Sequence, residues 1–141
     1  MSDINTSTGQ QCILLVDDYA PLARNSAFLL NLAGFEVVTA SDGLEALDCL
    51  RQRTPDLIIS DIDMPRLDGY DLLRQVRAQP EWVGVPFIFI SGRYTWEDLM
   101  LGLELGADDY VPKPFDIYDL LDAIGRTLAR PTPGVYQRKA G

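Results

Sequence analysis

The chain has 141 residues, 47% of them hydrophobic, which suits one domain of roughly 100 to 150 residues with its own core. Its 12 Lys and Arg residues against 21 Asp and Glu residues give a formal net charge of -9, which opposes binding to nucleic acid. The chain has no histidine, and this excludes a Ser-His-Asp triad, a His-ligated zinc site and a phosphohistidine of its own.

The cysteines and the N-terminal segment bear on the cellular location of the protein. Cys12 and Cys49 lie in apolar stretches without CxxC spacing, so we expect small core residues and neither a disulfide nor a zinc cluster. Residues 1–10 are polar and lack the features of a signal peptide, and no apolar run approaches the roughly 18 residues of a membrane span. We therefore expect a flexible tail at 1–10, no membrane contact and a cytoplasmic location.

Five short apolar runs predict five β-strands. The interior runs are continuously apolar and rich in Ile and Val, which is typical of parallel strands covered by helices on both faces. They start about 21 to 29 residues apart, which leaves room for one helix per connection and predicts five βα units. The predicted strands are Cys12–Val16, Phe35–Thr39, Asp56–Ser60, Val85–Ile90 and Asp109–Val111.

The first three connections carry helix signals. Pro21 marks a helix start and Gly34 a C-cap, and the third helix is predicted from about Asp68 to Ala78, before Gln79-Pro80. A second helix is predicted between Ser41 and the Thr54-Pro55 break. The predicted inward residues of the first two helices are Leu22, Ser26, Leu29 and Ala33, then Leu44, Leu47 and Leu50.

The last two helices are predicted on either side of the fifth strand. Thr95 is a candidate N-cap for the fourth, which ends before Gly106 and is expected to turn Leu99, Leu103 and Met100 inward. The fifth is predicted over Phe115–Ala129 and has helical spacing at Ile117, Leu120, Leu121, Ile124 and Leu128. Residues 131–141 contain two prolines and two glycines without periodicity, which indicates a linker or C-terminal tail.

Unusual polar residues follow the strands at their carboxyl ends, the edge where open α/β sheets bind ligands. Asp17 and Asp18 follow the first strand, Asp61 and Asp63 the third, Ser91 the fourth and Lys113 the fifth. Clustered carboxylates repel one another and call for a cation or a raised pKa, and a hard ion such as Mg²⁺ prefers oxygen ligands. Carboxylates also act as nucleophiles toward phosphoryl groups, with a hydroxyl and an ammonium as partners for the phosphoryl oxygens.

Four sequence blocks in this order resemble one known family. They are LLVDD, PDLIISDIDMPRLDGYDLL, FISG and GADDYVPKPF, and the resemblance to the receiver domain of two-component response regulators covers residues 11–130. It implies a flavodoxin-like (βα)5 receiver fold, an α/β fold with a doubly wound, five-stranded parallel sheet in strand order 2-1-3-4-5. Gly92, where alanine is common, and Ser91, in place of the more frequent threonine, are small departures.

The resemblance also implies roles for individual residues. Asp61 would accept a phosphoryl group from a phosphohistidine of a sensor histidine kinase or a histidine phosphotransfer protein. Mg²⁺ would be held by Asp17, Asp18, Asp61 and the backbone carbonyl of Asp63. Ser91 would move to the bound phosphoryl group, Lys113 would pair with it, and Tyr110 would be the aromatic that reports the switch. In the family, the bond between the lysine and Pro114 is commonly cis.

The resemblance further implies how a signal would leave the domain. The output surface would comprise the helix after Thr95, the strand Asp109–Val111 and the helix Phe115–Ala129. Its partners would be a downstream effector protein or a C-terminal output domain, and a homodimer through the same surface is a further expectation. The domain itself would not bind nucleic acid, and it would catalyse only its own phosphorylation and dephosphorylation at Asp61.

Three alternatives compete with this interpretation. Asp61-Ile62-Asp63 resembles the DxD pair of haloacid-dehalogenase-like phosphatases, but Asp108-Asp109 precede Lys113, which is the wrong order for that family. A flavodoxin-like electron carrier would need a loop rich in glycine and hydroxyl groups after the first strand, where this chain has two aspartates. A receiver-fold scaffold that is never phosphorylated remains the third alternative.

Overall fold

The structure is a computed structural model that describes residues 9–93 and 95–129. Five parallel strands form one sheet in the order β2-β1-β3-β4-β5, which confirms the predicted topology. Every residue of β1, β3 and β4 is buried, as expected for strands covered on both faces. The strands are β1 Cys12–Val16, β2 Glu36–Ala40, β3 Leu57–Asp61, β4 Phe87–Ser91 and β5 Asp109–Pro112.

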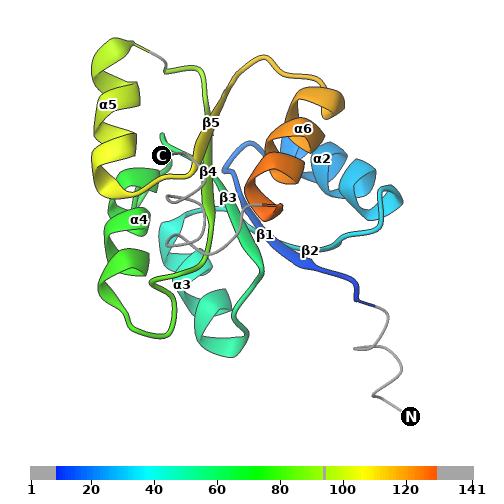
Figure 1. The fold of residues 1–141 in the computed structure, drawn as a ribbon, viewed down its shortest axis with the longest axis horizontal. Helices are drawn as coiled ribbons and strands as arrows, with labels where there is room; N and C mark the ends of the chain where they lie inside the picture. Colours follow the sequence, from blue (N-terminus) through cyan, green and yellow to red (C-terminus); the bar gives the residue numbers. More distant parts are fainter. Residues whose placement is uncertain (1–8, 94, 130–141) are drawn as a thin grey trace.

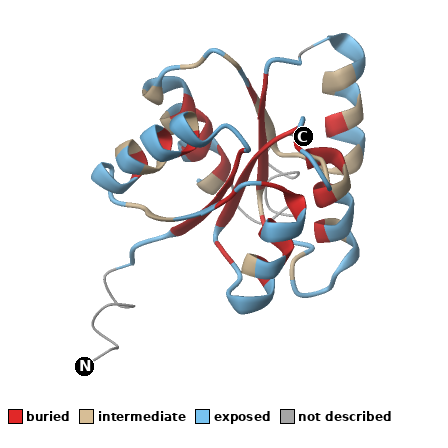
Figure 2. Ribbon diagram, turned by 180° about the vertical axis from the view of Figure 1, so that it is seen from behind, coloured by how far each residue is buried: buried red, intermediate tan, exposed pale blue. Residues whose placement is uncertain are grey.

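Five helices cover the two faces of the sheet. α2 and α6 pack on one face, and α3, α4 and α5 pack on the other (Figure 1). Alternate residues of each central strand therefore belong to two separate cores, for example Ile13 to one and Leu14 to the other. Figure 2 shows the central strands buried between the helices, whose outer faces are exposed. The helices are α2 Ala20–Leu32, α3 Gly43–Gln52, α4 Gly69–Ala78, α5 Trp96–Leu105 and α6 Ile117–Leu128.

The helix ends follow the predicted signals. Pro21 lies in the first turn of α2, and Gly34, with φ of 104°, follows its C-cap; Phe35 N–H donates to the Leu30 carbonyl at 3.1 Å. Thr95 caps α5 in a capping box with Asp98, and Gly106 ends that helix, also at φ of 104°. The left-handed conformation at both glycines explains why glycine occupies these positions.

Four residues that were predicted to face the core are exposed instead: Met100, Leu103, Leu44 and Ala33. Met100 and Leu103 are 40% and 62% exposed, because α5 instead packs Gly102 against the Phe89 ring, with Leu101 and Leu105 beside it. Leu44 at the start of α3 is 41% exposed. The inward stripe of α2 is Ala23, Ser26 and Leu30, whereas Leu22 and Leu29 are half-buried and Ala33 is exposed. The predicted inward residues of α6 are all buried or half-buried.

Several expectations concern the ends of the chain and the cysteines. The predicted tails, 1–10 and 131–141, lie outside the described residues apart from residues 9 and 10. Cys12 is buried, Cys49 is half-buried, and both thiols are free. Within residues 9–93 and 95–129, none of the helices has the length and apolar character needed to cross a bilayer.

Candidate functional site

Three carboxylates meet at the carboxyl-terminal edge of the sheet. Asp17 and Asp18 follow β1, and Asp61 is the last residue of its neighbour β3. One carboxylate oxygen from each residue lies within 4.8 Å of the other two. Asp17 and Asp61 are buried at 2% and 7% exposure, whereas Asp18 is exposed. The structure thus brings together the three acids that the sequence predicted as neighbours.

Lys113 enters the same site from the end of β5. Its Nζ lies 3.2 Å from Asp17 Oδ2 and 3.1 Å from Asp61 Oδ2, so one ammonium bridges the two buried carboxylates. The Lys113 N–H donates to the Ser91 carbonyl at 2.8 Å, which ties the lysine to the end of β4. The Lys113-Pro114 peptide bond is cis. These contacts confine the ammonium to the edge where the acids gather.

The titration of the site reflects burial and the charges around it. Burial raises the pKa of Asp61 above its usual value, and the nearby Asp17 adds to the shift, although Lys113 acts against it. Burial by itself would lower the pKa of Lys113, but the charges of Asp17 and Asp61 outweigh it and raise that pKa. Lys113 therefore stays cationic at neutral pH and offsets part of the negative charge of the cluster.

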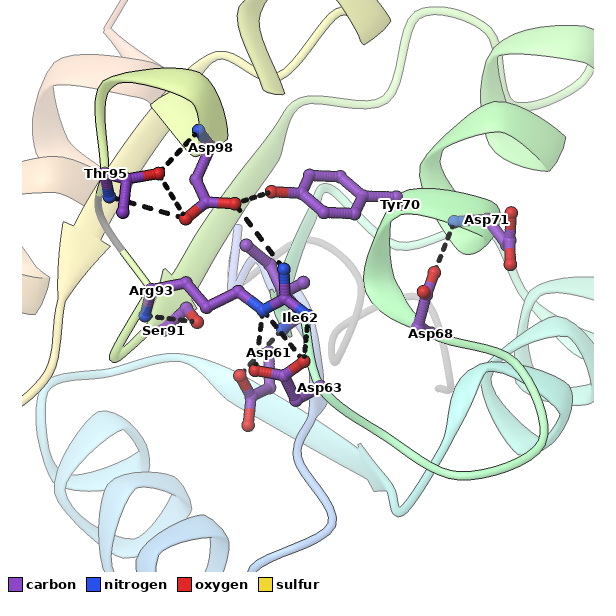
Figure 3. Close-up of polar contacts among 10 residues, drawn as sticks. All are labelled: Asp61, Ile62, Asp63, Asp68, Tyr70, Asp71, Ser91, Arg93, Thr95 and Asp98. Carbon is purple, nitrogen blue, oxygen red and sulfur yellow. Dashed lines mark hydrogen bonds and ion pairs between the residues drawn. The ribbon is translucent and has the colours of Figure 1, made fainter. Parts of the chain in front are cut away.

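Ser91 is the last residue of β4 and is 1% exposed. Its Oγ accepts a hydrogen bond from the Arg93 N–H at 3.0 Å. On the neighbouring strand β3, Asp61 Oδ1 accepts from the Ile62 N–H at 2.7 Å. Both side chains are therefore held by backbone donors of the loop that follows their own strand, as Figure 3 shows.

Arg93 is a site residue that the sequence interpretation missed. Its guanidinium contacts the exposed carboxylate of Asp63, with Nε 2.9 Å from Oδ1 and Nη2 2.8 Å from the same oxygen. Its Nη1 lies 3.5 Å from Asp98 Oδ1 at the start of α5, and the Tyr70 hydroxyl donates to that oxygen at 3.2 Å (Figure 3). A basic residue two positions after the strand-end Ser91 was the sequence signal that could have revealed it.

Tyr110 lies on β5 beside the aromatic core. Its ring centroid is 6.1 Å from that of Phe89, and its hydroxyl is buried beside the side chain of Ser91. Burial raises the pKa of this hydroxyl. The hydroxyl is thus already buried in this structure, and a turn of Tyr110 on phosphorylation stays a prediction.

The chemistry of the cluster suits a hard cation. All donors of Asp17, Asp18 and Asp61 are carboxylate oxygens, the ligand type that Mg²⁺ prefers, and Mg²⁺ sites in proteins commonly use one or two carboxylates with water and phosphate oxygens. The exposure of Asp18 gives solvent and a phosphoryl donor access to this group. The donor set therefore fits Mg²⁺.

Comparison with known proteins identifies the family. The sequence pattern of the response regulator receiver domain matches residues 13–125. The DNA-binding response regulator MtrA of Mycobacterium tuberculosis is 38% identical over 123 residues, which are 87% of this chain and 53% of MtrA. The chain belongs to the response regulator receiver domain family, and it spans about half the length of the curated relatives that it matches.

Solved structures agree with this assignment. Chemotaxis response regulator CheY4 of Vibrio cholerae superposes with a TM-score of 0.80 at 32% identity, over 84% of this chain and 98% of CheY4. The receiver domain of sensor histidine kinase PA1611 from Pseudomonas aeruginosa has a TM-score of 0.79 at 30% identity, over 86% and 99% of the two chains. That structure has a magnesium ion coordinated in its active-site cleft. The family match favours the receiver-domain prediction over the phosphatase alternative.

Proposed function

We propose that this receiver domain accepts a phosphoryl group on Asp61 from a phosphohistidine of a sensor histidine kinase or histidine phosphotransfer protein. The observation that carries the proposal is the position of Asp61, a buried strand-end carboxylate 3.1 Å from the Lys113 ammonium and grouped with Asp17 and Asp18. Receiver domains are signalling proteins and not classical enzymes, and the chemistry proposed for this chain is limited to its own Asp61.

The transfer step uses groups that the site already holds. A carboxylate oxygen of Asp61 attacks the phosphorus, the phosphorus–nitrogen bond to the donor imidazole breaks, and the imidazole leaves with the electron pair and takes up a proton. Lys113, now paired with Asp61, then donates to a phosphoryl oxygen, and Ser91 at the neighbouring strand end offers a second donor. Attack requires ionised Asp61, which Lys113 favours against the effect of burial.

Mg²⁺ is the cofactor that we propose for this site. Asp17, Asp18, Asp61 and the backbone carbonyl of Asp63 would hold it. When bound, it neutralises negative charge on the transferring phosphoryl group. Asp17 is already fixed for this role, because its Oδ1 accepts from the Tyr19 N–H at 3.0 Å and its Oδ2 from Lys113.

The proposed output surface comprises α5, β5 and α6. A groove of about 220 Å³ lies along α5 and β5, and Trp96 and Leu103 beside it are 73% and 62% exposed. Phosphorylation would draw the Ser91 hydroxyl inward, away from the Arg93 N–H, and Tyr110 would respond on β5. An effector protein, a second copy of this chain or an output domain would bind the altered surface.

The partners of the whole protein follow from its relatives. MtrA is a DNA-binding response regulator and is about twice as long as the matched region, so a C-terminal output domain beyond a receiver unit at 11–130 and a linker at 131–141 is one proposal. The receiver unit itself would not bind nucleic acid, because the chain carries a net charge of -9. We propose a cytoplasmic location, where a sensor histidine kinase or phosphotransfer protein would deliver the phosphoryl group.

Labelling with a small acyl phosphate tests the proposal. Wild-type chain is incubated with radiolabelled acetyl phosphate, with and without MgCl2, beside Asp61→Asn and the matched variant Asp56→Asn. We expect Mg²⁺-dependent label that is released by alkali or hydroxylamine on wild type and on Asp56→Asn, and none on Asp61→Asn. Unlabelled wild type would support the scaffold alternative, and label retained by Asp61→Asn would place the acceptor elsewhere.

A further inference from the structure

The loop between β3 and α4, residues 62–68, carries Asp63 and is held at both of its ends. At the far end, the Gly69 N–H donates to the Ile62 carbonyl at 2.8 Å. A Cβ atom on Gly69 would collide with the Asp61 carbonyl, so only glycine allows this close approach. The ends of the loop are thus fixed against β3 by backbone contacts.

The C-terminal part of the loop rests on the start of α3. The Gly43 N–H donates to the Leu67 carbonyl at 3.1 Å, and a Cβ atom on Gly43 would lie 2.6 Å from the same oxygen. Glycine at this position lets the first turn of α3 meet the loop backbone directly. The loop therefore takes its position from α3 as well as from β3.

Asp42 adds a side-chain contact between α3 and the loop. Its carboxylate is 7% exposed; Oδ1 accepts from the Glu45 N–H at 2.9 Å as the N-cap of α3, and Oδ2 accepts from Arg66 Nε at 2.7 Å. The Arg66 guanidinium and the Glu45 N–H lower the pKa of this carboxyl, so it is ionised at neutral pH. One buried carboxylate thus caps a helix and binds the loop.

Arg66 pairs with Asp42 from an unfavourable backbone conformation. Its φ is 69°, in the left-handed region that residues with a Cβ atom avoid. A conformation of this kind persists only where surrounding contacts enforce it. The ion pair with Asp42 is such a contact. Arg66 lies three residues after Asp63 in the same loop.

We propose that Asp42 and Arg66 are positioning residues for the Mg²⁺ site, because their ion pair fixes loop 62–68, which carries the Asp63 carbonyl that the proposed function assigns to Mg²⁺. This inference rests on the proposed function. Neither residue belongs to the carboxylate cluster of Asp17, Asp18 and Asp61. Any effect of these two residues on Mg²⁺ affinity would therefore result from a change in the conformation of the loop.

Calorimetric titration of MgCl2 into the full chain tests this role. Asp42→Asn keeps a side-chain acceptor for the N-cap but loses the charge, and Arg66→Gly removes the guanidinium while suiting a positive φ. We expect each variant to raise the Mg²⁺ dissociation constant by about three- to tenfold. The double variant should be no weaker than the weaker single variant, and Arg66→Lys should recover part of the affinity.

Matched controls separate positioning from net charge and from stability. Glu36→Gln and Arg53→Ala make the same two changes in charge in an exposed ion pair of 2.6 Å at the start of β2, the opposite edge of the sheet from the loop. We expect these controls to stay within about twofold of wild type in Mg²⁺ affinity. A purely structural role would lower the melting temperature of Asp42→Asn and leave Mg²⁺ affinity unchanged, and that result would overturn the inference.

The two proposals fail in different ways. If the wild-type chain takes up no Mg²⁺, the proposed function fails and the positioning role fails with it. If wild type binds Mg²⁺ and both Asp42→Asn and Arg66→Gly bind it equally well, the positioning role alone is wrong. If the controls weaken binding as much as the two variants do, the effect is one of net charge and the inference is again wrong.

Discussion

The two ends of α5 are attached to the rest of the domain by different chemistry. At the C-terminal end, Arg77 of α4 donates from Nη2 to the Gly106 carbonyl at 2.7 Å and from Nη1 to the Val85 carbonyl at 2.6 Å. Only 21% of its side chain is exposed, and burial lowers the pKa of the guanidinium. At the N-terminal end, Arg93 is 49% exposed and contacts the carboxylates of Asp63 and Asp98.

We call the contacts of Arg77 at the C-terminal end of α5 the permanent anchor and those of Arg93 at its N-terminal end the adjustable anchor, because the two respond differently to charge at the acidic cluster. Arg77 mainly binds the backbone carbonyls of Gly106 and Val85, which keep their partial charge whatever happens at the acidic cluster. Its carboxylate partner, Asp108, precedes β5 at the opposite edge of the sheet. Asp63, the partner of Arg93, lies two residues from Asp61 (Figure 3). A charge added at Asp61 therefore changes the electrostatic potential at the ion pair between Arg93 and Asp63. We expect signals from the acidic site to reach α5 through its N-terminal end.

Removing the permanent anchor should have the largest effect. Arg77→Ala removes the guanidinium donors to the carbonyls of Val85 and Gly106 and the ion pair of 3.3 Å with Asp108. We expect the free energy of unfolding, measured by urea denaturation, to fall by about 3 kcal/mol.

Arg74→Ala is the matched control for this loss. Arg74 lies on the same helix, but its ion pair with Asp71 is about half exposed on both sides. Its removal should change the free energy of unfolding by about 0.5 kcal/mol or less. Equal losses in the two variants would show that the buried contacts of Arg77 contribute nothing beyond a surface charge.

High pH should weaken the adjustable end through Tyr70. Burial, with the charge of Asp98 and a hydrogen bond to it, raises the pKa of Tyr70 to about 12. The folded state therefore favours the neutral hydroxyl, and this stabilisation is complete below the unfolded value of about 10 and is lost as pH rises toward about 12.

Tyr70→Phe isolates that contribution from other groups that titrate at high pH. At pH 8, wild type should exceed Tyr70→Phe by about 1 kcal/mol in the free energy of unfolding. The gap should close between about pH 10 and 12. If the free energies of unfolding of the two proteins differ by a constant amount across this pH range, the pKa of Tyr70 is not raised in the folded state.

Gly102→Ala probes the middle of α5, between its two anchors. A Cβ atom there would lie 3.4 Å from the Phe89 ring, an ordinary contact distance. Alanine is the better helix former, so we expect a gain of about 0.5 kcal/mol in thermal or urea denaturation. Gly102→Leu should instead lose stability by overpacking against Phe89. A lower stability of Gly102→Ala would show that α5 cannot move away from β4 to accommodate the added methyl group.

The sequence predicted the candidate site better than it predicted the helix that responds to it. Asp17, Asp61 and Lys113 could be placed together because parallel strands share one carboxyl-terminal edge, and each residue directly follows or ends a strand. The orientation of α5 could not be predicted, because apolar residues occur around most of the helix. Its packing was decided by Gly102 and Phe89, a contact between distant parts of the chain.

The roles of the arginines were also invisible in the sequence. Arg77 and Arg93 are long side chains whose partners lie up to 31 residues away, and no local spacing identifies those partners. The same holds for Arg66 and Asp42, which are 24 residues apart. Strand ends fix backbone positions, whereas the reach of an arginine depends on the finished tertiary structure.

Arg93→Ala should have the smallest effect on global stability and the most local effect on dynamics. Its own side chain is half exposed, and its shorter ion pair is with the exposed Asp63, so we expect a change in the free energy of unfolding of about 0.5 kcal/mol or less. Hydrogen exchange should nevertheless become faster at Leu99 N–H, in the first turn of α5, and stay unchanged at Ala107 N–H, which donates to the Gly102 carbonyl at 2.9 Å.

A milder variant than Arg77→Ala gives the complementary measurement. Arg77→Lys keeps a donor but cannot reach several carbonyls at once, so it should speed exchange at Ala107 and leave Leu99 unchanged. If either variant speeds exchange at both ends equally, α5 opens as one rigid unit. The distinction between a permanent and an adjustable end would then be wrong, and signals from Asp61 would have to move the whole helix at once.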